Sequence, residues 1–123
     1  MAVAIARKNL ERRFRVESAG LDGAIGFGAT RFAKEAMKEL GLDISKHESK
    51  DISSLSETFD YIVAMTPYVA ERLKGMPILD RAVLIVWDVA DPYGSGLANY
   101  RICAKTITKL LDELVGYIDQ RDI

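Results

Sequence analysis

The sequence predicts an α/β fold in which helices cover both faces of a small parallel sheet, and three observations lead to it. Residues 61–65 and 83–87 are continuous apolar runs, as expected of strands that are buried on both faces. Residues 14–18 alternate between apolar and polar side chains and are predicted to form a third short strand. Stretches with helical periodicity separate these runs, and the alternation of strands with helices indicates a parallel sheet.

Four helices are predicted from the spacing of apolar residues. They cover residues 1–13, residues 30–40, a stretch that begins at Thr66-Pro67 and stops at Gly75, and residues 97–118. Threonine before proline is typical of an N-cap and first helical position, and Gly41 is placed to end the second helix. The glycines between Gly20 and Gly28 indicate a loop, and the polar residues 43–58 indicate a loop with a short helical turn.

Composition excludes several classes of function. A chain of 123 residues is expected to form a single domain, residues 1–123, and its 17 basic and 18 acidic residues argue against a nucleic-acid partner. One cysteine and one histidine provide neither a disulfide nor a metal-site spacing, so we expect no metal and no cofactor. The longest apolar run, residues 82–87, is far below the roughly 20 residues of a membrane helix. Arg7 interrupts the N-terminus too early for a signal peptide, and we expect a cytoplasmic protein without a membrane partner.

Polar residues that follow the strands mark the candidate site, because ligands of open α/β sheets bind beyond the carboxyl ends of the strands. Asp91-Pro92-Tyr93-Gly94 follows the last strand, and Ser18-Ala19-Gly20 follows the first. An aspartate stiffened by proline and followed by an aromatic residue suits a proton donor beside a ring-binding wall. The same four residues also fit a type I turn, so the spacing alone leaves both interpretations open.

Four stretches, taken in order, resemble the low-molecular-weight protein-tyrosine-phosphatase family. They are the first helix running into Val-Glu-Ser-Ala-Gly-Leu at 16–21, residues 41–50, residues 59–65, and Asp-Val-Ala-Asp-Pro-Tyr-Gly at 88–94 with Tyr100-Arg101. The resemblance implies a three-layer α/β/α fold around a small parallel sheet. It also implies hydrolysis of phosphate monoesters through a cysteinyl-phosphate intermediate, with a phosphorylated protein or a small phosphate ester as substrate.

The resemblance assigns roles to three residues. Asp91 matches the family's general acid, which protonates the departing oxygen and then activates water. Tyr93 matches the aromatic residue that lines the substrate mouth, and Ser18 matches the serine that supports the phosphate loop by hydrogen bonds. Lys50 stands where the family often has arginine, and its role is left open.

The family's nucleophile has no counterpart in the sequence. Members begin with a hydrophobic strand and a Cys-x5-Arg-Ser loop, whereas Met1-Ala2-Val3-Ala4 lies where the helix after that loop is expected. Cys103 is followed six places later by Lys109 instead of arginine, and it is predicted to be a buried core thiol. We therefore expect an N-terminally truncated domain or a mis-assigned initiator, and no phosphatase activity from the chain as given.

The expected loss of the family's first, central strand would leave the flanking strands with unpaired edges and an apolar groove. Either another chain or segment fills that groove, a second copy in a homodimer being one candidate, or the strands close up in a new order. A pseudophosphatase or protein-interaction domain is therefore an alternative, as is a relative of the arsenate reductases. The reductases need further redox cysteines, which Cys103 alone cannot replace. Specificity for phosphotyrosine or phosphoarginine stays open. His47 is predicted to have a solvated or loop-stapling role in its polar loop.

Overall fold

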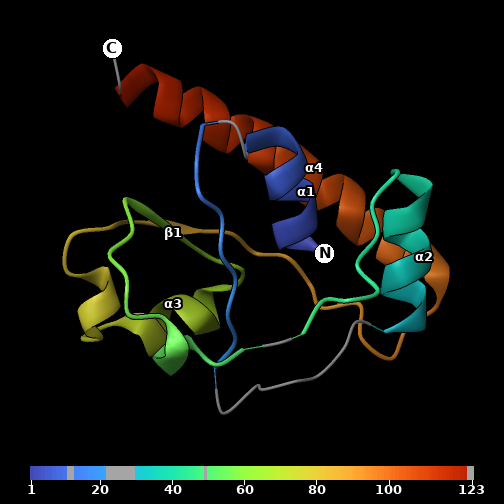
Figure 1. Ribbon diagram of the computed structural model, residues 1–123, viewed down its shortest axis with the longest axis horizontal. Coiled ribbons are helices and arrows are strands. Elements are labelled where there is room, and N and C mark those ends of the chain that lie inside the picture. The colour runs from blue at the N-terminus through green and yellow to red at the C-terminus, as the bar shows by residue number, and fades with distance from the viewer. Residues whose placement is uncertain (11–12, 22–29, 49, 122–123) are drawn as a thin grey trace. The chain divides into compact units, whose positions relative to one another are not determined.

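The computed structural model describes residues 1–10, 13–21, 30–48 and 50–121 (Figure 1). The chain forms two compact units. The helical unit comprises Met1–Ile52 and Asp91–Ile123, and the sheet unit comprises Ser53–Ala90. The glycine-rich loop predicted from Gly23, Gly26 and Gly28 lies outside the described residues.

The helical unit is built on one long helix. Helices α1 (Ala2–Leu10) and α2 (Arg31–Glu39) both pack against α4 (Leu97–Arg121), as Figure 1 shows. The faces that meet bury Val3, Ile5, Leu10, Ala33, Ala36, Met37, Tyr100, Cys103, Ala104, Ile107, Leu111, Leu114 and Ile118. The stripe that spacing predicts for the second helix, Phe32, Ala36 and Leu40, is only partly correct, because Leu40 is exposed and Met37 is buried in its place. The helices predicted at 1–13, 30–40 and 97–118 are thus confirmed, with ends that differ by a few residues.

Side chains fix both ends of α2. The Thr30 hydroxyl accepts a hydrogen bond from the Ala33 amide at 3.4 Å and donates one to the Tyr100 hydroxyl at 3.1 Å, so it caps α2 and joins it to α4. Gly41 has a φ of +77°, the left-handed conformation that glycine adopts readily after a helix. The guanidinium of Arg101 binds both carboxylate oxygens of Glu39, at 2.6 Å for the shortest contact.

The sheet unit contains two parallel strands, β1 (Tyr61–Ala64) and β2 (Val83–Val86), with Tyr61 paired to Val83. Helix α3 (Pro67–Leu73) connects them and packs on both, with Ala70 and Leu73 buried. Its N-cap is Thr66, whose hydroxyl accepts the Val69 amide at 3.2 Å, and its first residue is Pro67. The cap and the proline are where the sequence predicted them.

Residues 14–18 do not form the strand predicted from their alternation. They have no ladder with any described strand, and an isolated parallel bridge joins Gly20 to Asp51 just beyond them. Alternation of side chains sets the faces of a strand, but a strand also needs a hydrogen-bonding neighbour along its edge. The sheet therefore has two strands instead of the predicted three.

The two strands are also less buried than their apolar sequences predicted. Ala64 is the only strand residue that is fully buried, and Val86 has 47% of its surface exposed. Within the described part of the sheet unit, α3 is the only α-helix, so there is one helix to cover a sheet that has two faces. Trp87, predicted to lie in the second strand, follows β2 and is buried, with its amide bound to the Ala64 carbonyl at 2.8 Å.

The connections agree with the sequence in one further respect. The short helical turn predicted within residues 43–58 is the 3-10 helix Ile52–Ser54.

Across the described residues, none of the helices has the length and apolar character that crossing a bilayer would require.

Met37 is the largest side chain with no exposed surface, and its truncation should be costly. We expect Met37→Ala to lower the free energy of unfolding by about 2–5 kcal/mol, because the lost methylenes leave a cavity against α4. Its exposed neighbour Lys38 provides the control. Lys38→Ala should change stability by less than about 0.5 kcal/mol. Urea unfolding followed by circular dichroism measures both, and equal effects of the two substitutions would contradict this packing.

Candidate active site

Asp91 and Tyr93 lie on the short loop that enters α4. One carboxylate oxygen of Asp91 accepts the Tyr93 amide at 3.0 Å, which forms an Asx turn. The next turn is closed by the Ser95 amide, which donates to the Pro92 carbonyl at 2.9 Å, with Gly94 at a φ of +82°. The turn thus spans residues 92–95, one residue later than the type I turn that the sequence suggested. Asp91 lies outside the turn and is exposed.

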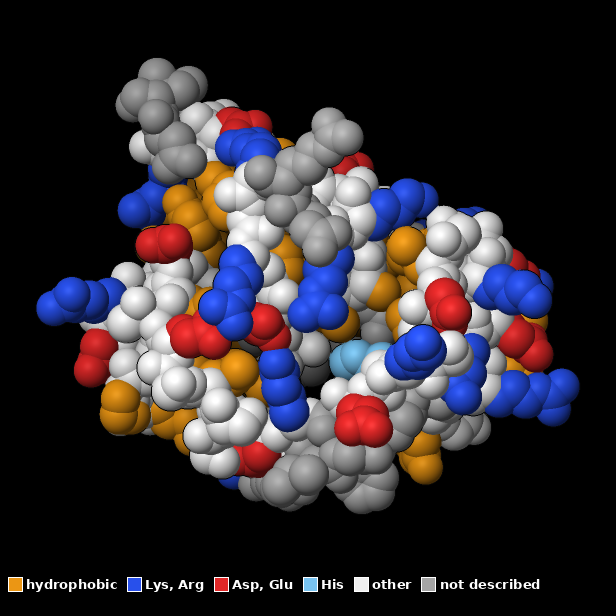
Figure 2. Space-filling view, in the orientation of Figure 1, with side chains coloured by type: hydrophobic (Ala, Val, Ile, Leu, Met, Phe, Trp, Pro, Cys, Tyr) orange, Lys and Arg blue, Asp and Glu red, His pale blue; other side chains and the backbone are white. Residues whose placement is uncertain are grey.

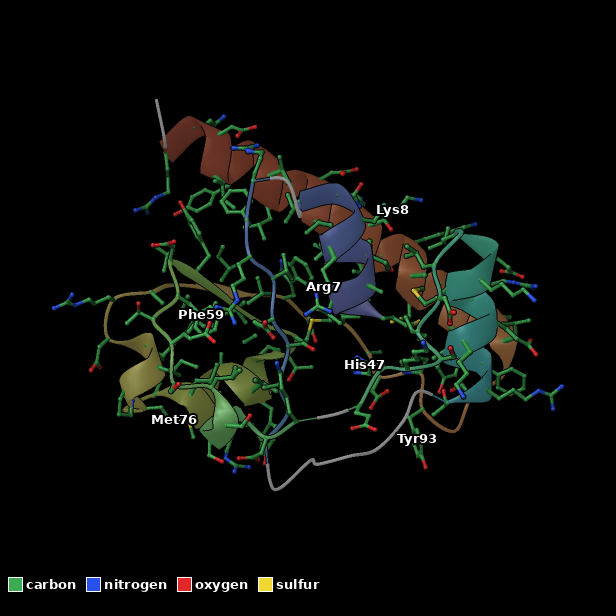
Figure 3. The ribbon with its side chains drawn as sticks, viewed as in Figure 1. Arg7, Lys8, His47, Phe59, Met76 and Tyr93 are labelled. Atoms are coloured by element: carbon green, nitrogen blue, oxygen red, sulfur yellow. The ribbon has the colours of Figure 1, made fainter. Side chains whose placement is uncertain are left out.

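Tyr93 is the most exposed of the large apolar or aromatic side chains in the described residues, with 75% of its surface accessible. It projects outward from its loop in Figure 3. The Asx turn fixes the backbone between Asp91 and Tyr93, so the loop presents a carboxylate and an aromatic ring in a set relation to each other. That arrangement suits an acid beside a substrate mouth, which is the role the resemblance implies.

Ser18 lies in the irregular segment 14–18 and is half-buried. Its backbone is anchored just downstream, where the Gly20 amide donates to the Lys50 carbonyl and the Ile52 amide donates to the Gly20 carbonyl, both at 2.8 Å. Among the described residues, no hydrogen bond joins Ser18 to Asp91 or Tyr93. The structure therefore places the three predicted residues in one unit and joins Asp91 to Tyr93, whereas it shows no hydrogen bond from Ser18 to either of them.

A charged cluster surrounds the residue before Ser18, and sequence reasoning did not find it. The Glu17 carboxylate binds Lys50 and lies 3.4 Å from Arg15 and 3.8 Å from Arg7. The hydrogen bond from Lys50 holds the pKa of Glu17 below its ordinary value, so Glu17 is ionised at neutral pH. This gives Lys50, whose role the resemblance left open, a partner. The cluster joins residues that are 43 positions apart (Arg7 to Lys50), which no local pattern indicates.

His47 is half-buried beside this cluster. Burial lowers the pKa of its imidazole, and the amino terminus, Arg7 and Lys50 lower it further. Figure 3 shows Arg7 on α1 and His47 on the neighbouring segment, and Figure 2 shows the single histidine among lysine and arginine side chains. The imidazole is therefore neutral at physiological pH, and it is less solvated than the sequence suggested.

Cys103 is buried in α4, as predicted. Burial raises the pKa of its thiol, the amino group of Met1 lowers it, and the Asp91 carboxylate raises it again. The net effect keeps the thiol protonated at neutral pH, whereas a nucleophilic cysteine needs a thiolate. Cys103 lacks both the exposure and the ionisation that covalent phosphoryl transfer requires.

In the parts of the chain that the structure describes, no three histidine, cysteine, aspartate or glutamate side chains are grouped to hold an ion. The candidate site therefore consists of the exposed Asp91 carboxylate, the exposed Tyr93 ring and the cationic side chains around Glu17.

A family model for the low molecular weight phosphotyrosine protein phosphatase matches residues 1–122 of the chain. The chain belongs to this family. No curated protein sequence matches it. Solved structures do: a low molecular weight protein tyrosine phosphatase from T. tengcongensis is 29% identical, with a TM-score of 0.78 over 94% of this chain and 88% of that one.

Other members of the fold are similar at lower identity. The YwlE arginine phosphatase from Geobacillus stearothermophilus is 23% identical, with a TM-score of 0.80 over 98% of this chain and 84% of that one. An arsenate reductase in the reduced state is 21% identical, with a TM-score of 0.73 over 95% of this chain and 86% of that one. These likenesses establish the α/β fold of the family, here with a two-stranded parallel sheet.

The burial and pKa of Cys103 predict a slow thiol. In native protein at pH 7, we expect iodoacetamide to alkylate Cys103 at least about tenfold more slowly than an exposed cysteine, because thiolate and access are both scarce. The control is Ala98→Cys in a Cys103→Ser background, since Ala98 is exposed on the same helix. Intact mass spectrometry follows both reactions. Equal rates in the two folded proteins would show that Cys103 is a reactive thiol.

Proposed function

We propose that this chain contributes the acid and the substrate mouth of a cysteine-dependent phosphatase, and that by itself it does not hydrolyse phosphate monoesters. Asp91 is the general acid, Tyr93 borders the substrate mouth and Ser18 supports the phosphate-binding loop. The single observation that carries the proposal is the Asx turn of an Asp-Pro-Tyr-Gly loop in a chain that the family model matches over residues 1–122.

The chemistry assigned to Asp91 follows from its turn. One carboxylate oxygen accepts the Tyr93 amide, so the proton of the acid form belongs on the other oxygen. As the bond between phosphorus and the leaving oxygen breaks, Asp91 gives that proton to the leaving oxygen. The resulting carboxylate then takes a proton from water while the water oxygen attacks phosphorus and the bond between phosphorus and the nucleophile breaks. This step releases inorganic phosphate and the free nucleophile and restores the acid form of Asp91.

The nucleophile is the part that these 123 residues do not provide. Cys103 is the only cysteine, it is buried, and Lys109 occupies the place where an arginine would hold the phosphate oxygens. Without a thiolate and a cradle of N–H donors, neither the covalent step nor the stabilisation of charge on phosphorus can occur. The lone thiol also argues against the relay of an arsenate reductase, which needs further cysteines.

The proposed substrate is a phosphorylated protein or a small phosphate ester. Tyr93, with its accessible ring, suits a substrate that brings an apolar or planar group beside the phosphate. The proposed place of action is the cytoplasm, where a thiolate nucleophile stays reduced.

A phosphatase assay tests the proposal on two proteins in parallel. One is the 123-residue chain, and the other is a chimera in which a family-type strand and Cys-x5-Arg loop precede Met1. We expect no turnover of a chromogenic phosphate ester by the chain and measurable turnover by the chimera. In the chimera, Asp91→Asn should lower kcat by about 10²–10⁴, the usual contribution of a general acid.

Asp88→Asn in the same chimera is the matched control, because Asp88 is also exposed and lies three residues earlier. It should leave kcat unchanged. Turnover by the unextended chain at the level of the chimera would refute the proposed division of roles. Equal rates for the Asp88 and Asp91 variants would refute the assignment of the acid.

A second function, association through a sheet edge, is favoured by the geometry of β1. The carbonyls of Asp60 and Ala64 accept from Val83 and Trp87 on the β2 side, at 2.9 and 2.8 Å. Because backbone groups alternate along a strand, those of Tyr61 and Val63 point to the opposite edge, which no described strand covers. We propose a homodimer in which two copies of β1 pair antiparallel about a two-fold axis.

Sedimentation velocity over a range of concentrations tests this association. We expect a dimer whose population grows with concentration, and Val63→Pro should abolish it because proline removes an edge amide. Val69→Ala on α3 is the control for general loss of stability and should retain the dimer. A monomer at every concentration, or a dimer that survives Val63→Pro, would exclude pairing through β1.

A further inference from the structure

The backbone around Ser18 is held in an unusual way. The Phe14 amide donates to the Leu10 carbonyl and the Gly20 amide to the Lys50 carbonyl, both at 2.8 Å. Between these anchors, residues 16–19 make no backbone–backbone hydrogen bond with another described residue. A half-buried stretch usually obtains such bonds from neighbouring strands, whereas this one is contacted by groups from two side chains.

Arg7 provides the first of these groups. Its guanidinium donates two hydrogen bonds to the Val16 carbonyl, from Nε at 3.1 Å and from Nη2 at 3.0 Å. A single carbonyl oxygen has two lone pairs, so Arg7 satisfies it fully from a side chain of α1. The Arg7 side chain thus donates the hydrogen bonds that a backbone amide of a neighbouring strand would otherwise donate to this carbonyl.

Glu17 provides the second. Its side chain is 15% exposed, and its two oxygens meet Lys50, Arg15 and Arg7. Lys50 lies beside the Gly20–Asp51 bridge and Arg7 lies on α1, so one carboxylate ties the segment to two other parts of the helical unit. Three cations around one anion repel one another once that anion is lost, and the cluster depends on Glu17 more than on any single cation.

We infer that Glu17 is a positioning residue: with Arg7, it fixes the backbone of residues 16–19, and hence Ser18, by charge in place of a β ladder. The fixed backbone is a property of these contacts alone. Its use in supporting a phosphate loop through Ser18 rests on the proposed phosphatase function.

Amide hydrogen exchange tests the inference without requiring activity. We expect Glu17→Gln to speed exchange of the Gly20 and Ile52 amides, whose hydrogen bonds anchor this segment beside Lys50, about five- to tenfold, because charge-assisted contacts are replaced by weaker neutral ones. Arg7→Met should affect the same amides. In the double variant, the loss in the free energy of protection should be smaller than the sum of the two single losses, since both residues act in one network. Glu17→Asp, which keeps the charge, should restore part of the protection.

The matched control is Glu39→Gln, which breaks an exposed carboxylate–guanidinium pair with Arg101 elsewhere in the helical unit. It should leave exchange of the Gly20 and Ile52 amides unchanged. In the native protein, salt at about 1 M should speed exchange of these amides toward the rate of Glu17→Gln, because the Debye length is then only about 3 Å and the charges of the cluster are screened. The same salt should have little effect on the Glu17→Gln variant.

The pH dependence of amide exchange provides an independent test. The folded-state pKa of Glu17 lies below its ordinary value, chiefly because of the Lys50 hydrogen bond. The stabilisation is therefore complete above the unfolded pKa of about 4.3 and is lost as pH falls through the folded pKa. Protection of the Gly20 and Ile52 amides, corrected for intrinsic exchange, should fall in that acidic range in the native protein and not in Glu17→Gln.

Two results would overturn the inference. One is unchanged exchange of the Gly20 and Ile52 amides in Glu17→Gln, and the other is an equal rise along α4, which would mean general destabilisation. Failure of the phosphatase chimera together with the expected exchange pattern would refute the role of Ser18 and leave the positioning by Glu17 intact.

Discussion

Three cationic side chains meet at the carboxylate of Glu17, and the backbone around Ser18 depends on that meeting. Arg7 belongs to α1, Arg15 to the irregular segment and Lys50 to the loop that bridges Gly20. Peptide groups that are withdrawn from water need partners, and in an α/β sheet these come from adjacent strands. Here a guanidinium and an ion cluster perform that task, which makes the local structure sensitive to charge.

The need of peptide groups for hydrogen-bonding partners also explains why the sheet is small. Residues 14–18 have the alternation of a strand, yet without a ladder they remain irregular, and among the described residues the sheet consists of β1 and β2. Most of the apolar side chains of these strands are half-buried. The chain keeps the α/β fold of the family with a small parallel sheet.

How much the sequence predicts depends on the range of the interactions involved. Helices and caps are local, so the Thr30 and Thr66 caps, the glycines after α2 and α3 and the stripe of α4 could be predicted from neighbouring residues. Pairing along a strand edge is not local. For this reason the alternation of residues 14–18 predicted a strand that does not form, and the apolar sequences of β1 and β2 predicted more burial than they have.

The residues of the candidate site also differ in whether local or long-range interactions place them. Asp91 and Tyr93 follow from one loop and a family resemblance, and the structure adds the Asx turn that orients them. The Glu17 cluster brings together residues from distant parts of the sequence, and each of its members looks like an ordinary surface charge when read alone. The sequence carries no signal that pairs Glu17 with Lys50, because their half-burial becomes visible only in the fold.

The central claim is that these residues provide an acid without a nucleophile. Rapid quench of the 123-residue chain with a phosphate ester, followed by intact mass spectrometry, tests it most directly. The account predicts no covalent phosphoryl adduct at any time point, because Cys103 is a buried, protonated thiol. A transient adduct on Cys103 would contradict it.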